Sequence, residues 1–94
     1  MSATREWLVE GRVQGVAFRA SARRRALELG VDGIAENLPD GRVRVIGRGE
    51  PDALDRFADW LADGPPAARV DALTPVRDRT DANDDVPATG FAIR

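Results

Sequence analysis

The sequence predicts one α+β domain in which two helices pack on one face of an antiparallel sheet. Its 94 residues are enough for a single domain with its own core. Two stretches carry apolar residues at helical spacing, and the stretches around them alternate apolar and polar residues as half-buried strands do. The order is strand, helix, strand, strand, helix and strand, with a further short strand at the C-terminal end.

The first strand and the first helix are predicted before Gly30. Residues 5–13 alternate, with Trp7 and Val9 on one face, which is the period of a half-buried strand. From Phe18 to Leu29 apolar residues recur every three or four positions, and this spacing predicts a helix. Gly30 then supplies a natural helix stop.

A hairpin and the second helix are predicted next. Residues 31–38 and 42–48 flank a Pro-Asp-Gly turn, which is a hairpin signal. Pro51 suits the first position of a helix, and apolar residues follow at i, i+3, i+4 and i+7 from Leu54 to Leu61. The second helix is therefore expected to start at Pro51 and to end near Gly-Pro-Pro.

The last third of the chain completes the fold. Residues 70–77 are predicted as a strand, 78–87 as a solvated loop and 91–93 as a short edge strand. This order is that of a ferredoxin-like split βαββαβ sandwich with an antiparallel sheet. Right-handed crossovers then fix its topology.

Composition restricts the chemistry and the partners. The chain has no cysteine, histidine, tyrosine or lysine, so thiolate, Ser-His-Asp, Schiff-base and histidine-metal mechanisms are excluded and no metal site or cofactor is predicted. A net charge of -2 argues against a nucleic-acid partner. Neither a long apolar run nor a signal-peptide pattern occurs, so we expect cytoplasmic residence and no membrane partner.

The turn between the first strand and the first helix is a candidate anion site. Residues 14–17 join the two elements directly, so several backbone N–H groups lack strand or helix partners and can converge on an anion. Gly15 permits unusual backbone angles, and Arg19 offers a planar fork of donors. From these residues alone, a phosphate cradle and a plain turn both remain open.

Two motifs resemble one known family. The run GRVQGVAFR at residues 11–19 is similar to the acylphosphatase signature, in which Gly-Arg-Val-Gln-Gly-Val leads through a variable residue to Phe-Arg. ENLPDG at residues 36–41 resembles the second signature of that family, and the closing GFAIR resembles its usual last strand. Element order and length agree along essentially the full chain, which implies one acylphosphatase-like domain over residues 1–94.

The resemblance implies an activity and a set of site residues. The enzyme would be a monomeric acylphosphatase, acting on acyl phosphates to release a carboxylate and inorganic phosphate. Arg19 would bind the phosphoryl group and Asn37 would orient the attacking water. The cradle would be formed by the loop residues Gln14, Gly15, Val16, Ala17 and Phe18.

Two alternative functions stay open. One is a noncatalytic phosphate-binding or regulatory domain of the same fold. The other is an RNA-binding module, although the first and third strands lack the stacking aromatics that such modules use. A turnover assay would separate the first alternative from the enzyme, and RNA binding at low salt would test the second.

Some residues depart from the family pattern. Ala17 stands where many relatives have a glycine or an aromatic residue, and Glu36 stands where a basic residue is common. Alternation along the strand should point Glu36 to the face opposite Asn37, so its expected effect is on rate or substrate choice. The basic run at residues 23–25 is interpreted as a solvated helix face, in preference to a guide for anions.

Overall fold

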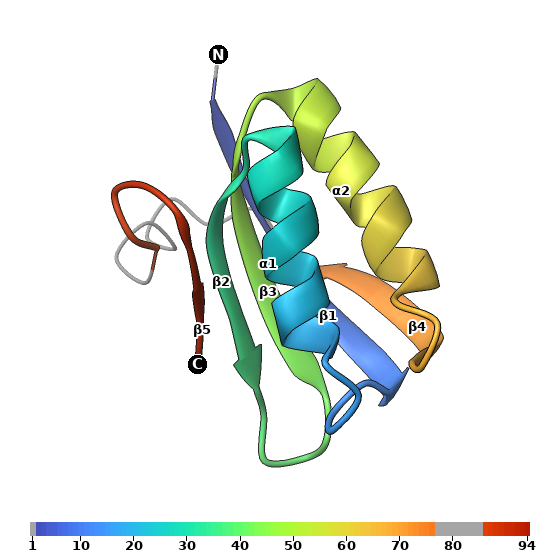
Figure 1. The fold of residues 1–94 in the computed structure, drawn as a ribbon. Coiled ribbons are helices and arrows are strands. Elements are labelled where there is room, and N and C mark those ends of the chain that lie inside the picture. Colours follow the sequence, from blue (N-terminus) through green and yellow to red (C-terminus); the bar gives the residue numbers. More distant parts are fainter. Residues whose placement is uncertain (1, 77–85) are drawn as a thin grey trace.

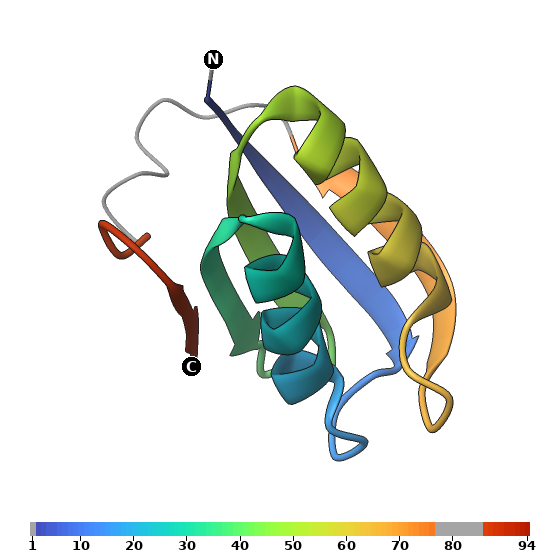
Figure 2. The same ribbon diagram turned by 45° about the horizontal axis from the view of Figure 1, so that its top comes forward.

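The structure, a computed structural model, describes residues 2–76 and 86–94. Within these residues two helices cover one face of a five-stranded sheet, as Figures 1 and 2 show from two directions. The split βαββαβ order and the short C-terminal edge strand predicted from the sequence are confirmed. The elements are β1 (Ala3–Arg12), α1 (Phe18–Leu29), β2 (Asp32–Asn37), β3 (Val43–Gly49), α2 (Pro51–Asp63), β4 (Arg69–Val76) and β5 (Phe91–Ile93).

The strand order in the sheet is β4-β1-β3-β2-β5. β1 pairs antiparallel with β3 and β4, and β2 pairs antiparallel with β3. β5 pairs with β2 in parallel, with Ala35 opposite Ile93, so the sheet is mixed where the sequence predicted an antiparallel one. β4 and β5 lie at opposite edges of the sheet and do not form a hairpin with each other. The direction of β5 is therefore not set by pairing with β4. Of the solvated loop predicted at 78–87, residues 78–85 lie outside the described part of the chain.

The main core lies between the sheet and the helices. α1 buries Phe18, Ala22 and Ala26, which recur every four residues and so form one stripe. The Phe57 ring of α2 makes T-shaped contacts with two other rings, Trp7 at 5.8 Å and Phe91 at 5.9 Å between centroids. Each large apolar side chain buried here contributes about 1.5–3 kcal/mol to stability.

A smaller cluster lies on the other face of the sheet. Ile34 and Ile46 are fully buried there against Val86. Arg48 donates from Nη2 to the backbone oxygens of Pro87 at 2.6 Å and Ala88 at 3.0 Å. These contacts fix the segment that leads into β5.

The end of α1 and the start of α2 agree with the sequence prediction. Gly30 takes a left-handed conformation, with φ of 73°, and the amide of Val31 donates to Ala26 O at 2.8 Å. Pro51 is the first residue of α2, where a missing N–H costs nothing. No helix in the described residues is long and apolar enough to cross a membrane.

Candidate active site

The loop between β1 and α1 presents a row of unpaired backbone amides. Gly15 has φ of 75° and Ala17 has φ of 60°, and Ala17 is the one non-glycine residue with positive φ in the described chain. The first hydrogen bond of α1 runs from Ser21 N to Ala17 O at 3.0 Å. The amides of residues 15–19 therefore have no partner within the described residues. Together with the helix dipole, they form a concavity suited to an anion.

Arg19 lines a small hollow at this loop. The hollow has a volume of about 170 Å³. Arg19 is half-buried as a residue, and its guanidinium donates from Nη1 to the backbone oxygen of Arg94 at 2.5 Å, while its other N–H groups have no partner within the described chain. The guanidinium is therefore oriented on one side and available on the other. The lining residues are Val13, Gly15, Ala17, Phe18, Arg19, Ala20 and Ile93.

Asn37 ends β2 beside the same backbone oxygen. Its amide donates to Arg94 O at 3.3 Å, so this one oxygen accepts from both Arg19 and Asn37. The side-chain oxygen Oδ1 of Asn37 is buried and has no hydrogen-bond partner in the described structure. A buried acceptor left unpaired costs about 1–3 kcal/mol. The atom keeps an unused acceptor, although it is closed to solvent here and Asn37 is not among the residues that line the hollow.

The side chain of Gln14 points to the β2–β3 turn. Its Nε2 donates to Leu38 O at 2.8 Å and to Arg42 O at 2.9 Å. The same turn is closed by Leu38 N donating to Arg42 O at 2.8 Å. Gln14 therefore ties the loop before α1 to the residue that follows Asn37.

We expect Gln14→Leu to lower turnover by on the order of tenfold or more, because small displacements of positioning residues are costly in rate. It should also lower the free energy of unfolding by about 1–3 kcal/mol, since the two hydrogen bonds from Nε2 are lost. Inhibition by inorganic phosphate should change little, because the side chain does not line the hollow. The measurements are phosphate release, phosphate inhibition and thermal unfolding. Normal turnover in the folded variant would limit Gln14 to a structural role.

The other loop residues contribute differently. The side chain of Val16 packs against the main core, so this residue can contribute only its backbone to the cradle. Phe18 is fully buried, and its ring packs on Trp60 at 5.7 Å between centroids. The backbone oxygen of Arg94 and the side chain of Ile93 were not anticipated, because their place depends on the pairing of β5 with β2.

Carboxylates near the site are already paired. Oε1 of Glu36 on β2 lies 3.6 Å from Nη1 of Arg44, its cross-strand neighbour on β3. Because side chains alternate along a strand, Glu36 lies on the face of the sheet opposite Asn37. The amide of Arg42 donates to Asp40 at 3.1 Å and, with the Arg42 guanidinium, lowers the pKa of that exposed carboxyl. No group of three His, Cys, Asp or Glu residues that could hold a metal ion occurs in the described residues.

Comparison with known proteins gives a consistent match. The acylphosphatase family model matches residues 5–93. An acylphosphatase of Alkalilimnicola ehrlichii is 46% identical over 93 residues, covering 99% of both chains. Among solved structures, an acylphosphatase from Coxiella burnetii superposes with a TM-score of 0.83 at 32% identity, over 99% of this chain and 93% of that one. One from Bacillus subtilis superposes with a TM-score of 0.80 at 29% identity, over 100% and 99%.

Proposed function

The chain belongs to the acylphosphatase family, and we propose that it hydrolyses acyl phosphates in the hollow beside Arg19, with water oriented by Asn37. Membership supports cleavage of the carboxyl–phosphate bond in general. The assignment of roles is supported chiefly by one observation. The backbone amide of Asn37 and the guanidinium of Arg19 donate to the same backbone oxygen, and Asn37 Oδ1 has no hydrogen-bond partner in the described structure.

The loop and Arg19 would hold the phosphoryl group. The N–H groups of residues 15–19 would donate to its oxygens, and the free edge of the Arg19 guanidinium would donate a pair of charge-assisted hydrogen bonds. These donors are already in place, so little reorganisation is needed as charge builds up on the phosphoryl oxygens. The arrangement suits the in-line transfer of a phosphoryl group to water.

Asn37 would set the direction of attack. Its Oδ1 would accept a hydrogen bond from the water, and the water oxygen would form the new bond to phosphorus as the bond to the acyl oxygen breaks. The electron pair of the broken bond leaves on the carboxylate, and the proton lost by the water ends on the product phosphate. No covalent intermediate with the protein is required.

The leaving group explains why no acid is needed. A carboxylate has a conjugate-acid pKa of about 4–5 and departs without a proton, whereas an alkoxide needs one. Among the described residues, Arg19 is the only ionisable side chain that lines the hollow, and a guanidinium does not give up its proton in proteins. The site therefore matches acyl phosphates and not alkyl phosphate esters.

We expect an alkyl phosphate monoester to be hydrolysed more slowly than acetyl phosphate by a factor on the order of 10² or more. A general acid usually supplies a rate factor of this size, and the site has none to offer an alkoxide. Phosphate release from both compounds at equal concentration, corrected for the rate without protein, measures this ratio. Similar rates would reveal a proton donor in or near the hollow.

Turnover itself tests the proposed function. Phosphate release from acetyl phosphate should be catalytic in the presence of a chelator and should be inhibited by inorganic phosphate. A protein that binds phosphate but shows no turnover on a panel of acyl phosphates would be a noncatalytic domain of the family.

A further inference from the structure

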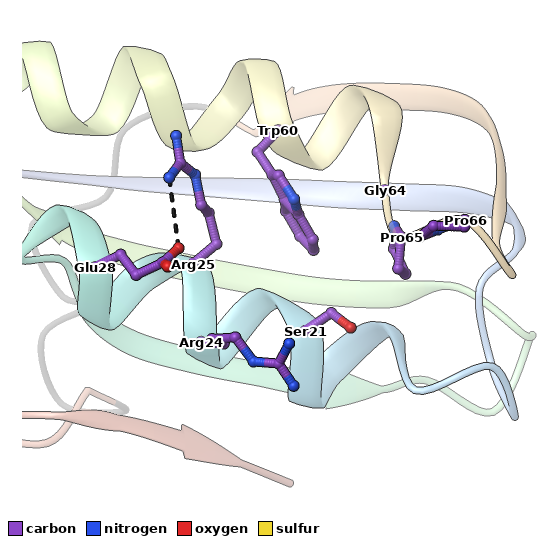
Figure 3. Close-up of a pocket in the computed structure, with 8 residues that line it drawn as sticks. All are labelled: Ser21, Arg24, Arg25, Glu28, Trp60, Gly64, Pro65 and Pro66. Carbon is purple, nitrogen blue, oxygen red and sulfur yellow. Dashed lines mark hydrogen bonds and ion pairs between the residues drawn. The ribbon is translucent and has the colours of Figure 1, made fainter.

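A second hollow lies between α1 and α2 (Figure 3), and none of its lining residues belongs to the phosphate cradle. Its volume is about 340 Å³, twice that of the hollow beside Arg19, and the two hollows have no lining residue in common. Pockets that bind small molecules span about 300–1,000 Å³, so this hollow has room for a ligand of modest size. The catalytic proposal assigns it no role.

The wall of the hollow is rich in hydrogen-bond donors that lack an acceptor. Nε of Arg25 is buried without a partner. Within the described residues the guanidinium of Arg24 and the indole N–H of Trp60 also form no hydrogen bond or ion pair. Glu28 is the only carboxylate that lines the hollow in the described part of the chain, and its Oε1 is paired with Nη1 of Arg25 at 3.4 Å. Nε of Arg25 is closed to solvent, so the donors available to a ligand are those of Arg24 and Trp60, and a lining with two arginines and one carboxylate favours an anion.

The other side of the hollow is formed by an aromatic ring and two prolines. Trp60 reaches from α2 toward α1 between Arg25 and Pro65, as Figure 3 shows. Its indole is half-buried and is held in place by packing on Phe18. Pro65 and Pro66 follow Gly64 at the end of α2 and have restricted backbones. An exposed aromatic surface next to proline rings suits a planar group.

We propose that this hollow binds a small organic anion, namely a phosphate or carboxylate carried on a planar ring. The anionic group lies on the arginine side of α1, and the ring lies against Trp60. The competing explanation is that Arg24 and Arg25 only balance the partial negative charge at the C-terminal end of α2, which closes the hollow at Gly64. That explanation predicts an effect on stability and no ligand.

The indole N–H of Trp60 provides a direct readout. The chain has two tryptophans, so a ¹⁵N-labelled sample gives two indole signals, and Trp60→Phe identifies the one from Trp60. The probes are phenyl phosphate, benzoate, inorganic phosphate and benzyl alcohol. We expect the Trp60 signal to shift and saturate with the two ring-bearing anions below on the order of 10 mM, and to respond far less to the ring or the phosphate alone.

Three variants locate the binding. Arg19→Ala disables the cradle, and the Trp60 shift should persist in it. Arg24→Gln should weaken phenyl phosphate binding about tenfold or more, which is the usual effect of losing a hydrogen bond to a charged group. Arg24 is exposed, so this variant should fold and should keep acetyl phosphate turnover. Arg23→Gln is the matched control, because Arg23 has the same charge on the same helix and does not line the hollow, and binding should stay within about twofold.

Three outcomes would overturn the proposal. They are a Trp60 signal that does not move with either ring-bearing anion, equal weakening by Arg23→Gln and Arg24→Gln, and loss of the shift in Arg19→Ala. The last result would mean that the signal reports on the cradle. None of them bears on the hydrolysis of acyl phosphates, which is measured separately.

Discussion

Arg19→Lys is expected to remove most of the activity although it keeps the positive charge. Arg19 uses Nη1 to hold the backbone oxygen of Arg94 at 2.5 Å, which leaves the rest of its planar fork for the phosphoryl group. The compact ammonium of a lysine cannot keep the contact with Arg94 and also span two phosphoryl oxygens. The loss should be roughly 3–5 kcal/mol of transition-state stabilisation, or about two to four powers of ten in rate.

Arg19 should also matter for binding, because it contacts the phosphoryl group before and during the reaction. Phosphate release and inhibition by inorganic phosphate should therefore both weaken in Arg19→Lys and in Arg19→Ala. Arg23→Lys, one turn further along α1, is the matched control and should behave as the parent does. Near-parental turnover in either folded Arg19 variant would show that this arginine is structural and that the cradle is misassigned.

The helices could be predicted closely because their signals are local. Residues 18–29 were predicted as a helix and form α1 with the same ends, since Gly30 and the apolar stripe lie within the segment itself. The first strand was predicted at 5–13 but runs from Ala3 to Arg12. Its pairing with β4 changes register between Glu10 and Gly11, a bulge that no alternation of side chains announces.

The candidate site could be predicted only in part, because its residues come from distant segments. The loop amides, Arg19 and Asn37 are found from the two motifs. The contact of Arg19 with Arg94 spans 75 residues and exists because β5 pairs with the edge of β2. This pairing depends on the order of strands in the sheet, which neither segment encodes by itself.

Chain topology also explains why the site tolerates an unpaired group. Ala35 O accepts from Arg94 N at 2.8 Å, so β5 continues its pairing with β2 as far as the position of Asn37. The backbone of Asn37 is thus held on one side by Arg94, while Gln14 holds the turn that follows. A fixed backbone lets the Asn37 side chain keep a buried oxygen without a partner, a local cost that the surrounding hydrogen bonds offset.

Asn37→Ala should separate catalysis from stability. We expect turnover to fall by on the order of 10² or more, because the water loses its orientation, while inhibition by inorganic phosphate stays nearly unchanged. The side chain makes no hydrogen bond within the described structure, and the substitution removes a buried unpaired oxygen. The free energy of unfolding should therefore be equal to that of the parent or higher.

The combined result is what distinguishes the roles of the two residues. Arg19 variants should lose turnover and phosphate inhibition together, whereas Asn37→Ala should lose turnover alone. The backbone hydrogen bond from Asn37 N to Arg94 O does not involve the side chain and should survive the substitution, so the position of β5 is not disturbed. Phosphate release, phosphate inhibition and thermal unfolding, measured on the same samples, test this pattern. Parental turnover in Asn37→Ala would remove the residue from the mechanism, and a large loss of stability would mean that the unpaired oxygen has a structural partner in solution.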